Sequence, residues 1–139
     1  MLIFKYYGSE NTYRNIASKD NYQRFNSWLN FNLDKLNIEP RIKQGIEMVF
    51  EEIYTNIFSY AYPTDEGEVE VSIYKEQDDI ILKFVDWGIE YNPLEKQDPD
   101  INLPPDERPI GGLGIFMVKQ TAKSVDYKYE NANIFTIRF

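Results

Sequence analysis

The sequence predicts an α+β fold, a two-layer α/β sandwich in which helices cover one face of a mixed, mostly antiparallel sheet. Two observations lead to this class. Segments with strand-like alternation come in adjacent pairs, and two helical segments also follow each other directly, in the order β-β-α-α-β-β-loop-α-β-β. A doubly wound parallel sheet would instead alternate strand and helix along the whole chain. The length of 139 residues, with 42% hydrophobic residues, predicts one folded domain over 1–139.

Local patterns define the elements of the N-terminal half. Ser18 or Asp20 can cap the first helix, because both side chains accept hydrogen bonds from free backbone N–H groups. Pro40 suits the first turn of the second helix, and Pro63 stops that helix. The expected elements are strands at 2–7 and 12–16, a helix with an apolar stripe from Tyr22 to Leu36, and a helix from 40 to 62.

The C-terminal half begins and ends with hairpins. Apolar residues alternate with polar ones before and after a Gln77-Asp78 turn, which predicts two half-buried strands. Residues 89–110 contain five prolines, so we expect a long irregular loop there, and such loops inside a compact domain are usually functional. The expected elements are strands at 68–73 and 80–86, a helix from Gly111 to about Ala122, and hairpin strands at 125–130 and 134–139.

Composition excludes several classes of function. The net charge of −8 argues against direct nucleic-acid binding, which depends on attraction to phosphates. The chain has no apolar run long enough for a membrane span and no signal segment, so we expect a cytoplasmic protein. The absence of cysteine and histidine excludes disulfides, thiolate or histidine metal sites and a Ser-His-Asp relay. Any general base must therefore be Asp, Glu, Lys or Tyr.

Glu52 and Asn56 are the first candidate site residues. Their spacing of four places the two side chains one above the other on one face of the second helix. A carboxylate can accept a proton, and a carboxamide oxygen is a hard ligand for Mg²⁺. The same spacing also occurs on solvated helix surfaces, so the pair carries weight only together with other motifs.

Two later segments add such motifs. Asp86 ends a strand, where its carboxylate can accept a hydrogen bond from an exocyclic amine, and Gly88 lets a flat base approach the backbone. The run GGLG at 111–114 precedes a helix, and glycines there let backbone N–H groups approach a phosphate. It matches neither the P-loop nor the dinucleotide fingerprint. A solvated aspartate and a flexible turn are the alternatives for the two segments.

Taken in order, these segments resemble the N, G1 and G2 boxes of the GHKL ATPase superfamily. The matching text is EIYTNIFSYAY at 52–62, DWGIEYNP at 86–93 and GGLGI at 111–115. The most similar branch is that of the anti-sigma-factor serine/threonine kinases of the RsbW and SpoIIAB type. The resemblance implies the Bergerat ATP-binding fold. The sequence departs from the pattern of that branch at Ser59, Tyr60, Asn92 and Gly112.

The resemblance implies a role for each matching residue. Glu52 would be the general base that takes the proton of a serine hydroxyl, and Asn56 would ligate Mg²⁺ on the ATP phosphates. Asp86 would receive the amino group of adenine. The other expected nucleotide contacts, beneath an ATP lid at about 89–110, are Gly88, Gly111, Gly112, the amide of Leu113, Gly114 and Thr136.

The function implied by the resemblance is an ATP- and Mg²⁺-dependent serine/threonine protein kinase that regulates transcription by partner switching. It would phosphorylate a STAS-type anti-sigma-factor antagonist and sequester a sigma factor, and a homodimer is expected. A non-catalytic ATP-binding regulatory module is the main alternative. A histidine-kinase catalytic domain is disfavoured, because the chain has no histidine to phosphorylate.

Overall fold

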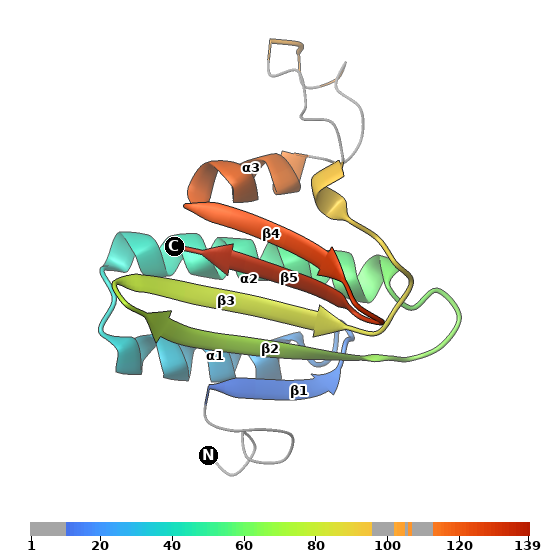
Figure 1. The fold of residues 1–139 in the computed structure, drawn as a ribbon, viewed down its shortest axis with the longest axis horizontal. Helices are drawn as coiled ribbons and strands as arrows, with labels where there is room; N and C mark the ends of the chain where they lie inside the picture. The colour runs from blue at the N-terminus through green and yellow to red at the C-terminus, as the bar shows by residue number, and fades with distance from the viewer. Residues whose placement is uncertain (1–10, 96–101, 105, 107–112) are drawn as a thin grey trace.

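The computed structural model describes residues 11–95, 102–104, 106 and 113–139, and within them five strands form one sheet (Figure 1). The strand order is β1-β2-β3-β5-β4, and every neighbouring pair is antiparallel. The strand bounds are β1 Thr12–Ile16, β2 Glu68–Glu76, β3 Asp79–Asp86, β4 Ser124–Tyr129 and β5 Asn133–Arg138. The strand predicted at 2–7 lies outside the described residues.

Helices lie on one face of this sheet, which confirms the predicted α+β class (Figure 1). The helix bounds are α1 Tyr22–Leu36, α2 Pro40–Tyr60 and α3 Leu113–Thr121. Pro40 occupies the first turn of α2, as predicted. The predicted cap of α1 was wrong: the N-cap residue is Asn21, which makes no side-chain capping bond, while Ser18 Oγ accepts from Asn21 N instead.

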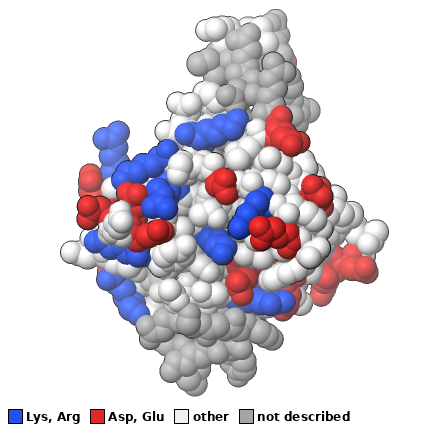
Figure 2. Space-filling view, in the orientation of Figure 1, with Lys and Arg blue, Asp and Glu red and all other residues white. Residues whose placement is uncertain are grey.

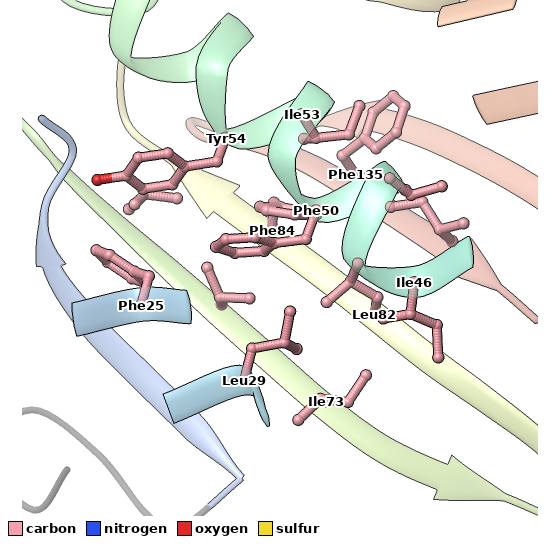
Figure 3. Close-up of a cluster of buried hydrophobic side chains, with 14 of the residues drawn as sticks. Phe25, Leu29, Ile46, Phe50, Ile53, Tyr54, Ile73, Leu82, Phe84 and Phe135 are labelled. Carbon is pink, nitrogen blue, oxygen red and sulfur yellow. The ribbon is translucent and has the colours of Figure 1, made fainter. Parts of the chain in front are cut away.

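The core lies between the helices and the inner face of the sheet. Figure 3 shows side chains of α1 and α2 meeting side chains of three strands. Phe50 of α2 stacks on Phe84 of β3, with ring centroids 5.8 Å apart, and on Tyr54, at 5.6 Å. The Tyr54 hydroxyl donates to Ser18 O, so this buried polar atom also fixes the segment before α1. Burial of these rings holds α2, the helix that carries Glu52 and Asn56, in a defined rotation on the sheet.

Strand parity decides which side chains reach the helical layer. On β3, Leu82, Phe84 and Asp86 are buried, and the residues between them alternate to the outer face. Asp86 stands directly opposite Asn133, the first residue of β5. Two polar side chains therefore meet at the end of an otherwise apolar inner face.

The outer face of the sheet carries interspersed positive and negative side chains (Figure 2). Arg14 of β1 pairs with Glu68 of β2 at 2.9 Å, and its guanidinium lies 4.1 Å from the ring centroid of Trp87. Arg138 of β5 pairs with Asp79 of β3 at 3.1 Å. These ion pairs tie neighbouring strands together on the side away from the helices. No helix in the described part of the chain has the length and apolar character needed to cross a membrane.

Two glycines bring α3 close to α2. A Cβ on Gly45 of α2 would lie 2.9 Å from Thr121 Cγ2 at the end of α3. A Cβ on Gly114, in the first turn of α3, would lie 2.0 Å from Glu52 Cδ. The missing side chains therefore permit a close antiparallel approach of the two helices. This approach places the Glu52 carboxylate against the N-terminal turn of α3.

Candidate functional site

A cavity of about 50 Å³ opens between the C-terminal half of α2 and the ends of β3, β4 and β5. Its walls are mainly aliphatic and aromatic, and three residues with a carboxylate or carboxamide side chain line it: Asn56, Asp86 and Asn133. Tyr60, with 60% of its surface exposed, and Ile89 are exposed at its rim. The lining residues are Ile53, Asn56, Ile57, Tyr60, Ala61, Asp86, Ile89, Tyr91, Pro93, Tyr127, Asn133 and Phe135. Mostly apolar walls with a few polar groups are typical of small-molecule sites.

Asp86 is the buried acceptor of this cavity. Its side chain is 6% exposed. Oδ1 accepts hydrogen bonds from Asn133 Nδ2 at 2.9 Å and from the backbone N of Gly88 at 3.0 Å. Because both bonds end on Oδ1, Oδ2 is the atom with which Asp86 can accept a further bond from the cavity.

Burial raises the pKa of the Asp86 carboxyl above its ordinary value, while the bonds from Asn133 and Gly88 act to lower it. The two N–H donors therefore offset part of the cost of keeping a charge in an apolar pocket. In its ionised form the carboxylate only accepts hydrogen bonds, and in that form Asp86 selects a donor group such as an exocyclic amine.

Gly88 has a structural reason to be glycine that sequence reasoning did not identify. A Cβ at this position would lie 2.2 Å from the carbonyl oxygen of Ala61, at the end of α2. The same carbonyl accepts a hydrogen bond from Ile89 N at 3.0 Å. Gly88 thus lets the chain leaving β3 pass directly over the end of α2. Its predicted position beneath a base stays a prediction.

Glu52 and Asn56 lie on one face of α2, as predicted, and are in contact. Asn56 Nδ2 donates to Glu52 Oε2 at 3.0 Å and to Glu52 O at 2.9 Å. Both partners can only accept, so they fix the orientation of the amide and turn Asn56 Oδ1 away from Glu52. Asn56 lines the cavity, whereas the Glu52 carboxylate rests against Gly114, one turn away along α2.

The glycine-rich segment is described only in part. Gly111 and Gly112 lie outside the described residues. Leu113 begins α3, and Gly114 follows it in the first turn, so the predicted helix after the glycines is confirmed. Of the lid expected at 89–110, the described part includes a 3-10 turn, η2, at Pro93–Glu95.

Thr136 does not belong to this site. It lies on β5 opposite Lys83 of β3 and Asp126 of β4, with the residues of the outer face. Its neighbours Phe135 and Ile137 are buried on the inner face, and Phe135 lines the cavity. Because successive side chains of a strand point to opposite faces, Thr136 points away from the cavity, and its expected contact with adenine does not fit the structure.

Asn133 is the site residue that sequence reasoning missed. The strand pattern predicts a turn at 131–133, between the hairpin strands expected at 125–130 and 134–139, but Asn133 begins β5 and is 6% exposed. A signal was present, because asparagine is unfavourable in strands, and a buried one needs polar partners. Tyr91 and Tyr127, which also line the cavity, both donate to Asn133 Oδ1.

The donor set fits a nucleotide and one metal ion. Asp86 Oδ2 suits an amine, and Asn56 Oδ1 suits a hard cation such as Mg²⁺. No group of three or more acidic, histidine or cysteine side chains that could hold a metal occurs among the described residues. An ion bound at Asn56 would therefore depend on phosphate oxygens for most of its ligands, as Mg²⁺ in nucleotide sites commonly does.

Comparison with known protein families gives a match that covers most of the chain. A family model described as a histidine kinase-like ATPase domain matches residues 17–139. The matched range contains α1, α2, α3, four of the five strands and all the residues of the cavity. None of the curated proteins compared with the chain matches it.

Proposed function

The chain belongs to the family of histidine kinase-like ATPase domains, and we propose that it is an ATP- and Mg²⁺-dependent serine/threonine protein kinase of the anti-sigma type. In this proposal it acts in the cytoplasm, as a homodimer. It phosphorylates a serine or threonine of a STAS-domain anti-sigma-factor antagonist. It sequesters a sigma factor when that antagonist is phosphorylated.

The observation that carries this proposal is the placement of Glu52. Asn56 Nδ2 donates to Glu52 Oε2 at 3.0 Å, and Gly114 of α3 lies against the Glu52 carboxylate. One turn later, Asn56 lines the cavity that contains Asp86. A proton acceptor and an oxygen ligand for a cation thus lie one turn apart on α2, and the second of them lines the same cavity as a buried acceptor for a base. This arrangement supports phosphoryl transfer at the end of the site near α3.

Each residue has one task in the proposed reaction. Asp86 accepts the amine of the base and so orients the nucleotide in the cavity. Glu52 accepts the proton of the attacking hydroxyl as the new oxygen–phosphorus bond forms and ADP leaves. Mg²⁺, when bound, supplies charge neutralisation at the phosphates. Asn56 contributes to both proton transfer and cation binding, since its Nδ2 positions Glu52 while its Oδ1 can bind the cation.

The decisive experiment compares Glu52→Gln with Glu51→Gln. Glu51 is exposed and lies about 100° away around α2, so it is a matched control on the same helix. Each protein is incubated with ATP, Mg²⁺ and a STAS-domain antagonist, and transfer is followed by intact mass. Loss of a general base should slow transfer by roughly 10²–10⁴-fold in Glu52→Gln and leave Glu51→Gln at the wild-type rate. Equal rates in both variants would remove Glu52 from the mechanism.

A non-catalytic ATP-binding module is the second candidate, and one observation favours it. The described residues that line the cavity include no lysine or arginine. Cationic groups commonly stabilise the charge of a transferring phosphoryl group. The same experiment separates the two functions. A wild-type protein that binds ATP and the antagonist but transfers nothing would be a switch that acts by binding alone.

A further inference from the structure

We infer that Asn133 is a positioning residue that sets base selectivity, because it holds Asp86 and the wall of the cavity in one hydrogen-bonded unit. This inference rests on the proposed ATP site and adds a residue to it. Asn133 acts through Asp86, which makes the contact with the base. Nothing in the resemblance or in the motifs of the chain assigned this role.

The amide of Asn133 uses its whole hydrogen-bonding capacity inside the protein. Nδ2 donates to Asp86 Oδ1 at 2.9 Å and to the carbonyl oxygen of Ile89 at 2.8 Å. Oδ1 accepts from Tyr91 N at 3.1 Å and from the Tyr127 hydroxyl. A planar amide with two donors and one double acceptor is the side chain that can make all four bonds at once.

The bond to Asp86 decides what the cavity recognises. It occupies Oδ1, so the carboxylate presents Oδ2 to the cavity, and it favours the ionised form. Without this donor, only the bond from Gly88 N holds Oδ1, and the buried carboxyl takes up a proton more easily. A protonated carboxyl donates as well as accepts. It would therefore tolerate a carbonyl on the base where the ionised form demands an amine.

The remaining bonds connect that acceptor to the wall of the cavity. Ile89 and Tyr91 both line the cavity, and both are bound through their backbones to Asn133. Ile89 is also held from the other side, because its N–H donates to Ala61 O of α2. The wall and Asp86 therefore keep a fixed spacing, which a base must match.

The test compares ATP with inosine triphosphate, in which a carbonyl oxygen replaces the exocyclic amine. Binding of both to the full-length protein is measured by calorimetry for wild type, Asn133→Ala, Asn133→Asp and Tyr127→Phe. Tyr127→Phe is the matched control, because it removes one bond to Asn133 Oδ1 and leaves both bonds to Asp86. Asn133→Asp keeps the acceptor for Tyr91 and Tyr127, so it serves if Asn133→Ala does not fold.

Wild type should prefer ATP by about tenfold or more, the value of one hydrogen bond to a charged group. Asn133→Ala should lose about tenfold of this preference, and Tyr127→Phe should retain it. An undisturbed preference in a folded Asn133→Ala protein, or in Asn133→Asp at about pH 9 where the shared proton is lost, would overturn the inference. A wild-type protein that binds neither nucleotide would overturn the proposed function itself, and this inference with it.

The pH dependence of Asn133→Asp gives a readout that a purely structural role would not produce. The introduced carboxyl can donate to Asp86 Oδ1 only while the two carboxyls share a proton, so ATP affinity should fall between about pH 5 and about pH 9, as that proton is lost. Burial raises the pKa of Tyr62 and of Tyr127, so neither loses its proton in this range. A flat profile would overturn the inference. The titratable groups near this pair include Tyr129, directly opposite Asn133 in the sheet, together with Tyr60, Tyr62, Glu90, Tyr91 and Tyr127.

Discussion

Replacing Gly114 by alanine should slow phosphoryl transfer strongly while the protein remains folded. The new Cβ would lie 2.0 Å from Glu52 Cδ and 2.2 Å from both carboxylate oxygens, whereas real contacts essentially never fall below 3.0 Å. The carboxylate must therefore move by about 1 Å or more. It is the far end of a flexible side chain, so it can rotate away without a shift of either helix.

The two consequences differ in magnitude. Alanine in place of glycine stabilises a helix by about 1 kcal/mol, and loss of the bond between Asn56 and Glu52 costs about 1 kcal/mol. The free energy of unfolding should therefore change by no more than about 1 kcal/mol. A displacement of about 1 Å in a reacting group, by contrast, can slow a reaction about 10²-fold.

Urea unfolding measures the free energy of unfolding, and the intact mass of the antagonist over time measures the rate of phosphoryl transfer. Gly88→Ala is the control, because its Cβ would lie 2.2 Å from Ala61 O, a backbone atom that cannot rotate away. The clash and the lost bond from Ile89 should cost about 2–4 kcal/mol. A folded Gly114→Ala protein with the wild-type transfer rate would refute the assignment of Glu52. If Gly114→Ala lowers the free energy of unfolding as much as Gly88→Ala does, the Glu52 side chain is not free to rotate away from the new Cβ.

Three further predictions concern the cavity and the core. Asp86→Ala should weaken ATP binding by about 1–3 kcal/mol, and unchanged binding in calorimetry would remove Asp86 from base recognition. Asn56→Ala should weaken binding of Mg²⁺–ATP more than binding of metal-free ATP, and equal losses would make Asn56 purely structural. Burial raises the pKa of Tyr54 from 10.0 to about 12. Between these two pH values the folded state keeps the hydroxyl proton while the unfolded state loses it. The free energy of unfolding should therefore fall by about 2–3 kcal/mol as the pH rises from 10.0 to about 12. In urea unfolding, the stability of Tyr54→Phe should fall less steeply with pH over this range than that of the wild type. An identical fall in both proteins would mean that other groups cause it.

Features that depend on neighbours in the chain could be predicted from the sequence. The spacing of Glu52 and Asn56 implied one helical face, and the structure places the two side chains 3.0 Å apart. Alternation predicted β2 and β3 together with their connecting turn, and Pro40 marked the start of α2. These predictions hold because helix and strand periodicity are local properties, which burial of an apolar face then enforces.

Which distant residues meet in the site follows from the packing of the folded chain and could not be predicted from the sequence. Asn133 lies 47 positions after Asp86, and the register of β3 with β5 brings the two together. The same register places Thr136 on the outer face, since a shift of one residue exchanges the two faces of a strand. The contact of Gly114 with Glu52 depends on how α3 packs on α2. Register and helix packing are set by the sum of many contacts across the core, and no short segment of sequence encodes them.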